Sequence, residues 1–285
     1  MSDALSTPTS PRPLRLTGIL FAALALTFVF ILIRFPYDLL AERVADSVER
    51  QTGMRISLGE ISVGIVKWGP GLEAEAVRIV RPNGARFELD QVGARPALSL
   101  SWLTGNPALA LEVSSVQGEV DGVATFGDAG GFHGTLANLD LAQLPPDLLR
   151  SPLQLEGIAN ADVALDGTEA GTEGKIRFDA QDGSLGHPNL PFALPFTTFS
   201  GDLDLGGDAF AEIRDLNLDS PLASGRGRGT VGKGPSFANA PLRLEIELTV
   251  SGAIQSSLAS QGVKVGRDGT VRVTLMGTPA RPTLR

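Results

Sequence analysis

The chain has 285 residues, with 34 glycines, 19 prolines, two histidines, no cysteine and a formal net charge of −8 at pH 7. The absence of cysteine excludes disulfides, thiol nucleophiles and cysteine-ligated zinc or iron–sulfur sites, and two histidines exclude a multi-histidine metal cage. A pI near 4.9 argues against nucleic acid as a partner, because neutralising phosphates requires clustered lysine and arginine.

The N-terminus predicts a membrane anchor. Residues 1–13 are rich in Ser, Thr and Pro, which indicates a disordered tail. An uncharged apolar run from Leu16 to Ile33 follows, with arginines on both sides, and about 17–25 such residues span a bilayer core. A cleaved signal peptide is the alternative, but its apolar stretch is usually only ~7–15 residues long. We therefore predict a transmembrane helix over residues 14–34, whose anchoring side chains include Leu16, Phe21, Leu26, Phe30 and Ile33.

The charges beside the anchor predict its orientation. Arg12 and Arg15 outweigh Asp3 on the short leading side, which favours a cytoplasmic N-terminus. Residues 35–285, with a net charge of −10, then lie across the membrane. In a bacterium this makes the chain a single-pass inner-membrane protein whose bulk is periplasmic.

Residues 35–54 predict a short amphipathic helix. Pro36 suits its first turn, Leu39, Leu40, Val44 and Val48 recur at helical spacing, and Gly53 suits its C-terminal cap. The polar side mixes acidic and basic residues, so a helix that caps a sheet is favoured over one that lies on a membrane surface.

From residue 55 onward the pattern changes to alternating apolar and polar residues, which is typical of half-buried strands. The clearest segment is Leu242–Val250, where five aliphatic residues share one face. The predicted strands are Ala85–Leu89, Ala97–Trp102, Leu109–Val113, Gly201–Leu205, Leu242–Val250 and Thr270–Leu275. Turns are predicted between them at Pro82–Gly84, Gly105–Pro107, Asp121–Gly122, Asp166–Gly167, Asp182–Gly183, Gly206–Asp208 and Asp268–Gly269.

This pattern predicts a mainly β fold, with about a dozen antiparallel strands over residues 55–285 and a possible sub-boundary near residue 145. Two regions look less regular: Phe126–Gly134, which is rich in glycine, and His187–Pro195, whose prolines belong in a loop or at an edge. The apolar faces are closed in a sandwich, or open as the groove of one curved sheet. In the second case Leu242, Leu244, Ile246, Leu248 and Val250 would line an apolar groove.

Three candidate chemical sites have simpler explanations. The segment 225–234 contains a GxGxxG pattern, but Pro235 follows where a phosphate-binding motif needs a helix, so a glycine-rich hairpin with Arg226, Arg228 and Thr230 on its wet face is favoured. Asp202, Asp204 and Asp208 lack the glycine and the distal glutamate of a calcium loop. His133 and His187 lack a recognisable nucleophile setting, although a Ser-His-Asp site assembled in space stays open. We therefore expect no catalytic, metal or cofactor site.

Four segments carry a family resemblance. They are the helix and strand LLAERVADSVERQTGMRISLGEISV, the segments GPGLEAEAVRIVRPNG and ALSLSWLTGNPALAL, and the closing Gly277–Pro282. With the anchor, they resemble protein N of type II secretion systems and its wider relatives, the AsmA-like proteins, whose repeated strands are similar to Gly157–Asp166.

The resemblance implies a non-catalytic inner-membrane component of the type II protein secretion machinery, with other secretion-system subunits as partners. The alternative is an AsmA-like protein that binds phospholipid or transfers it between the inner and outer membranes. About a dozen strands stacked ~4.8 Å apart would reach under 60 Å. Known lipid bridges are generally much longer, and this difference weakens the lipid-transfer alternative.

Overall fold

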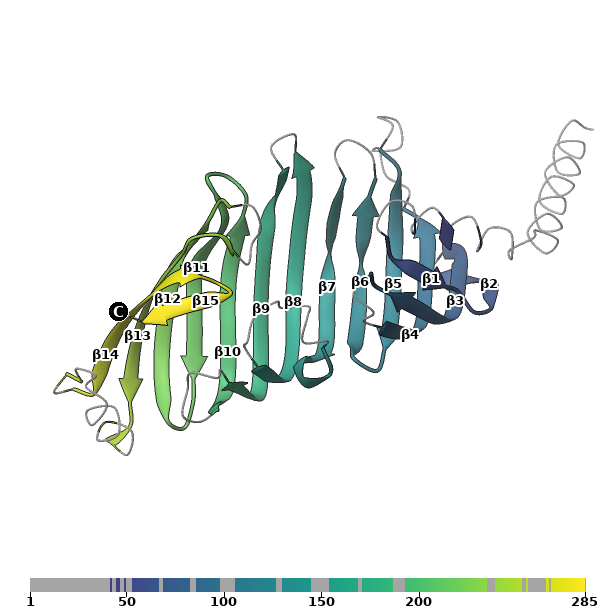
Figure 1. Cartoon of the computed structure of the whole chain (residues 1–285). Coiled ribbons are helices and arrows are strands. Elements are labelled where there is room, and N and C mark those ends of the chain that lie inside the picture. The colour runs from purple at the N-terminus through teal and green to yellow at the C-terminus, as the bar shows by residue number, and fades with distance from the viewer. Residues whose placement is uncertain are drawn as a thin grey trace, which may run out of the picture.

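The structure is a computed structural model that describes residues 42, 45–46, 49, 53–66, 69–82, 86–97, 106–126, 130–144, 154–168, 171–186, 193–234, 239–252, 255, 265–266 and 268–284. Fifteen strands form one long, curved antiparallel sheet (Figure 1). Their bounds are β1 Arg55–Ser57, β2 Ile61–Val66, β3 Gly69–Val80, β4 Arg86–Pro96, β5 Ala108–Ser115, β6 Gly118–Thr125, β7 Gly131–Asp140, β8 Gln154–Thr168, β9 Gly171–Gly186, β10 Leu194–Leu205, β11 Ala209–Asp219, β12 Ala223–Gly232, β13 Leu242–Val250, β14 Thr270–Thr278 and β15 Arg281–Leu284.

The sheet is a meander, because from β3 onward each strand pairs with the next strand along the chain. At the N-terminal end β1 and β2 both pair with β3, β1 along Arg78–Val80 and β2 along Gly69–Ala74. The 3₁₀ turn η2 (Leu141–Gln143) lies between β7 and β8 and contacts β8. The prediction of a mainly β, antiparallel fold is confirmed, and the described strands form one sheet where a sandwich would need two.

Most of the predicted strands are present. The segment Leu242–Val250 coincides with β13, Thr270–Leu275 begins β14, Leu109–Val113 lies inside β5, and Gly201–Leu205 ends β10. The segment Ala85–Leu89 is described from Arg86 on, as the first part of β4. In the segment Ala97–Trp102, Ala97 comes directly after β4 and the remaining residues lie outside the described part.

Three predicted turns are wrong. Asp121–Gly122 lies inside β6, Asp166–Gly167 near the end of β8, and Asp182–Gly183 inside β9. Asp182 has a positive φ of 49° and sits opposite the register shift at Gly157, so this Asp–Gly pair belongs to a β-bulge. The same backbone conformation serves bulges and turns, which is why the dipeptide alone misleads. The turns at Gly206–Asp208 and Asp268–Gly269 are confirmed.

The two irregular regions are partly ordered strand. β7 already begins at Gly131, within the segment Phe126–Gly134. Pro195 lies in β10 and pairs with Ser184 of β9, whereas pairing of β10 with β11 begins only at Thr198. This proline therefore sits where β10 is a local edge, and its missing N–H interrupts no ladder with β11.

The N-terminal predictions are described only in part. Glu42, Ala45, Asp46 and Glu49 are helical, and the Gly53 N–H donates to the Glu49 carbonyl oxygen at 2.9 Å with φ +69°, as expected of a C-terminal cap. The predicted anchor, including Leu16, Phe21, Leu26, Phe30 and Ile33, lies outside the described residues. Within the described residues, no helix has the length and apolar character that crossing a membrane requires. The predicted sub-boundary near residue 145 falls in residues 145–153, which lie outside the described residues. The strands before and after them, β7 and β8, pair with each other in the same sheet.

Candidate functional site

An unbroken row of apolar residues crosses the sheet from its N-terminal to its C-terminal end. The ladder registers place one residue of each strand from β2 to β14 in this row, each directly opposite the next. We call it the central row: Ile61, Ala74, Val92, Val113, Val120, Leu136, Ala161, Phe178, Gly201, Leu216, Gly227, Ile246 and Val273. With strands ~4.8 Å apart, its length is about 58 Å.

Two parallel rows lie beside the central row on the same face, both to the same side of it. One runs from Val63 of β2 to Leu275 of β14, and the other runs from Leu109 of β5 to Gly277 of β14. All their members are aliphatic, aromatic or glycine residues. Because alternate residues of a strand point to opposite faces, the whole set forms one apolar face about 14 Å wide.

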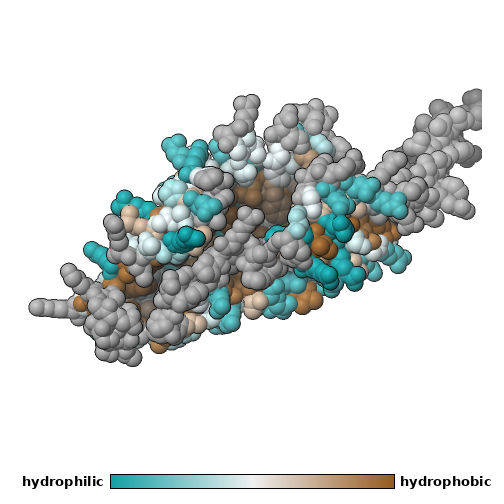
Figure 2. Space-filling view, viewed as in Figure 1, coloured by the Kyte–Doolittle hydropathy of each residue, from teal (hydrophilic) through white to brown (hydrophobic). Residues whose placement is uncertain are grey.

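The side chains of this apolar face are half-buried. Every aliphatic or aromatic side chain of the central row larger than alanine keeps part of its surface exposed. Among the described residues, the buried apolar side chains are alanines and valines apart from Phe196. Substantial contacts between described elements are confined to strands within the sheet and to η2 on β8. Figure 2 shows the apolar residues of this face lining a hollow between more polar rims. The described residues therefore provide the face with no second layer like that of a closed core.

Aromatic side chains of this face lie against glycines of the neighbouring strands, which leave room for the rings. A Cβ on Gly201 would lie 2.7 Å from Cε1 of Phe178, and a Cβ on Gly122 would lie 2.7 Å from Cζ of Phe132. Phe178 also meets Phe199 edge-on, with ring centroids 5.3 Å apart. The aromatic rings thus occupy the space that the neighbouring glycines leave free on this face.

The predicted groove residues lie on this face. Leu242, Leu244, Ile246, Leu248 and Val250 alternate with exposed residues along β13, and Ile246 belongs to the central row. The first four are half-buried and Val250 is buried against Ala223 and Val271. At the other end of the sheet Val63 is 41% exposed and Ile65 is 80% exposed, both on β2.

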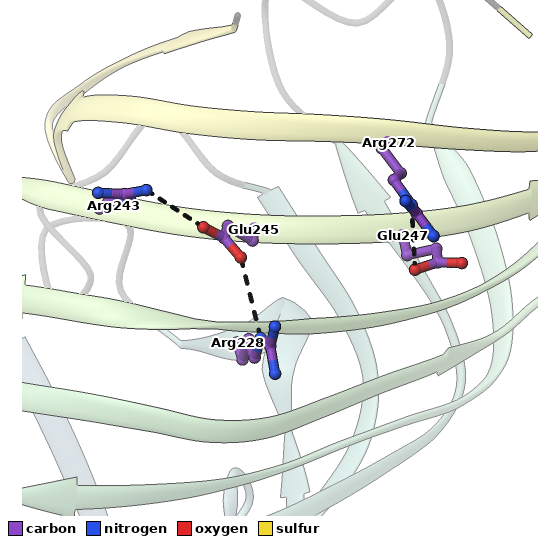
Figure 3. A network of polar contacts seen from close by, with 5 residues as sticks. All are labelled: Arg228, Arg243, Glu245, Glu247 and Arg272. Carbon is purple, nitrogen blue, oxygen red and sulfur yellow. Dashed lines mark hydrogen bonds and ion pairs between the residues drawn. The ribbon is translucent and has the colours of Figure 1, made fainter.

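The opposite face, which we call the polar face, is tied together by charged pairs. Arg177 Nε lies 2.6 Å from Asp202 Oδ1, and this hydrogen bond, reinforced by the charge of Asp202, raises the pKa of Arg177. Arg214 Nη2 forms an ion pair with Asp204 Oδ2 between the neighbouring strands β11 and β10. On β12–β14, Glu245 lies between Arg228 and Arg243, at 3.8 and 3.3 Å, and Arg272 lies 3.4 Å from Glu247 (Figure 3). Arg243 and Glu245 are both on β13, and the other pairs join neighbouring strands. Surface pairs of this kind help to hold strand register and contribute little stability each.

The residues considered for chemistry are dispersed over this polar face. His133 Nε2 lies 2.8 Å from Asp166 Oδ1, and both side chains are more than half exposed, whereas His187 lies outside the described residues. Asp202 and Asp204 are held by their arginines, and Asp208 is in the turn after β10. In the described part of the chain, no three acidic or histidine side chains are grouped so that they could hold a metal ion.

The glycine-rich segment is strand β12 with the residues that follow it. Arg226, Arg228 and Thr230 lie on the polar face, and Gly225, Gly227 and Gly229 lie on the apolar face. The expected wet face is thus confirmed, and the glycines form part of the hollow.

Comparison of the chain with protein-family models, with curated proteins and with solved structures gives no match. Sequence reasoning missed the continuity of the apolar rows, because it depends on the register of thirteen strands; the glycines that recur at alternate positions in β12 were the available signal.

Proposed function

We propose that this protein binds the acyl chains of phospholipids along the central row. The observation that supports this is the unbroken apolar row itself, in which the large side chains are half-buried. Exposing so much contiguous apolar surface to water is unfavourable by about 25 cal/mol per Å², so a hydrocarbon ligand would be stabilised there. The chains of one lipid reach across half of a bilayer core, or about 15 Å, so a row of about 58 Å has room for more than one lipid in file.

The floor of the hollow suits a flexible chain better than a rigid ligand. It offers methyl, methylene and ring surfaces, and no charged or hydrogen-bonding side chain interrupts the central row to fix an orientation. A ligand held this way is recognised by its hydrocarbon and keeps its polar headgroup at the rim.

Photo-crosslinking in cells would test the proposal on the full chain. A benzophenone amino acid placed at Ile246 or Leu136, both in the central row, is expected to capture phospholipid, which mass spectrometry of the purified adduct would identify. The matched control replaces Glu247, the next residue along β13, whose side chain points to the polar face. Lipid adducts at neither central-row position, or equally frequent adducts at Glu247, would contradict the proposal.

A second candidate is a subunit of the type II secretion machinery, and the observation that favours it is the N-terminal edge of the sheet. Among the described residues β2 pairs on one side only, and Val63 and Ile65 are exposed there. Such an edge can accept a strand from a partner protein. Deleting the gene and profiling secreted proteins tests this reading: we expect loss of secreted proteins, and an unchanged profile would reject it.

A further inference from the structure

Charge is separated along the chain. Residues 35–219 contain 12 Lys and Arg residues against 28 Asp and Glu residues, a net charge of −16. Residues 220–285 contain nine against three, a net charge of +6. Because the strands follow one another in chain order, β1–β11 belong to the acidic part and β12–β15 to the basic end. The sheet therefore carries opposite net charges towards its two ends.

The polar face of β12–β14 shows how the basic end is built. Arg226 and Arg228 lie on β12, Arg243 on β13 and Arg272 on β14, and the last three side chains are 67–81% exposed. Two carboxylates, Glu245 and Glu247, alternate with them (Figure 3). Four arginines against two glutamates leave a surplus of positive charge spread over three neighbouring strands.

The arrangement favours a broad anionic surface over a small anionic ligand. The depression on this face has a volume of about 670 Å³, and Asp215, Glu245 and Glu247 line it together with the arginines. A phosphate placed among three carboxylates would be repelled by them at close range. A plane of many negative charges is instead attracted by the net charge of the whole end, without entering the depression.

We propose that the polar face of β12–β14 docks on an anionic phospholipid membrane. Charge complementarity carries this inference. The chain as a whole is acidic and is repelled by such a surface, so attraction is confined to the basic end, and the charge separation turns that end towards the membrane. The proposal does not depend on lipid binding in the hollow, which involves the opposite face.

The experiment uses the full chain in nanodiscs of phosphatidylcholine, so that a membrane anchor is accommodated in neutral lipid. Binding is measured to immobilised vesicles of phosphatidylcholine with or without phosphatidylglycerol. We expect binding only to the vesicles that contain phosphatidylglycerol. It should be lost as salt rises from about 0.1 to about 1 M, which shortens the Debye length from about 10 to about 3 Å. Equal binding to both kinds of vesicle, or none to either, would overturn the proposal.

Two double variants locate the docking surface. Arg226→Gln with Arg272→Gln removes two charges from the basic end, and Arg78→Gln with Arg86→Gln removes two from β3 and β4. Each pair combines one arginine in an ion pair, Arg272 with Glu247 or Arg78 with Glu88, with one that has no ion pair to a described residue. We expect the first variant to bind about 30-fold more weakly, since each surface cation contributes about 1 kcal/mol, and the second to change binding by less than about twofold.

Equal losses in the two variants would overturn the proposal, and so would a preference for an acidic protein over the anionic vesicles. Circular dichroism of both variants checks that the sheet is retained. Lipid capture at Ile246 is expected to stay unchanged in the Arg226 and Arg272 variant, so failure of docking and failure of acyl-chain binding give different results.

Discussion

Strands β9 and β10 show the contrast between the two faces of the sheet. On the polar face Arg177 and Asp202 meet at 2.6 Å across the strands, and both side chains keep contact with water. On the apolar face Phe178, the next residue, lies over Gly201 and meets Phe199 edge-on. The polar side chains find their partners in the neighbouring strand and in solvent. The apolar side chains have neighbours beside them, but the described elements place almost nothing above them.

This difference teaches which face needs a partner. A hydrogen-bonded ion pair on an exposed face is satisfied by itself and by water. A half-buried apolar side chain keeps an unfavourable contact with water, and a ligand that covers it lowers the free energy of the complex. A ligand that binds only the folded sheet raises its stability by mass action. A hydrocarbon ligand is therefore expected on the apolar face, and changes there should affect stability and lipid capture more than changes on the polar face.

Phe178→Ala should give the largest change, a decrease of about 2–3 kcal/mol in the free energy of unfolding measured with urea. It removes a large ring from a site made for it by Gly201 and leaves a cavity beside Phe199. The control is Phe126→Ala, outside the strands, where the side chain is 47% exposed and a much smaller effect is expected.

Gly201→Val should be destabilising in the native chain and much less so together with Phe178→Ala, because the ring no longer blocks the new side chain. Additive effects of the two changes would mean that ring and glycine are not coupled.

Ile246→Asp distinguishes an open hollow from a closed core. In a half-buried position the carboxylate keeps part of its hydration, so a loss of about 1–2 kcal/mol in unfolding free energy is expected. Lipid capture should also be lost at Leu216, on the other side of Gly227 in the central row. A loss of several kcal/mol or failure to fold would indicate a closed core. The matched control is Glu247→Asp on the polar face, which should leave lipid capture unchanged.

Glu245→Gln tests the polar face and should have a smaller effect. Glu245 lies between Arg228 and Arg243, and all three side chains are well exposed, so we expect a decrease of about 0.5 kcal/mol that disappears in high salt. A decrease above about 2 kcal/mol would show that the polar face contributes as much to the free energy of unfolding as the apolar face, which would contradict the difference between the two faces. Urea unfolding at low and high salt measures the difference.

The local pattern of residues was sufficient for individual strands. The bounds of β13 follow from strict alternation in Leu242–Val250, and the cap at Gly53 follows from its position after a helical repeat. The choice between a sandwich and one sheet was not accessible in this way. It depends on whether successive strands extend one sheet, as they do here, or turn back to form a second sheet over the first, and alternation within a single strand is the same in both cases. Asp182–Gly183 has the composition of a turn, and only the strand opposite, with its register shift at Gly157, makes it a bulge.

The candidate site was predictable for one strand and not for the whole. The five apolar residues of β13 are visible in the sequence, whereas Gly201 and Gly227 carry no apolar side chain and do not look like members of an apolar face. They belong to the central row because the ladders align them with Phe178 and Ile246. What the sequence lacks is the register that joins thirteen such positions.

The smallest effect concerns the turn that leads into β14. The Thr270 N–H donates to Oδ1 of Asp268 at 3.1 Å, and this backbone hydrogen bond lowers the pKa of Asp268 below its usual 3.8. A lowered pKa means that the contribution is complete above the ordinary value and is lost as pH falls through the pKa of the folded state. Asp268→Ala should therefore lower the melting temperature slightly and by a constant amount from pH 7 to about pH 5, and the gap to the native chain should close in stronger acid. Because other carboxylates titrate equally in both chains, the difference between the two melting curves isolates this turn. A gap that persisted or widened in acid would show that the hydrogen bond does not favour the ionised carboxylate.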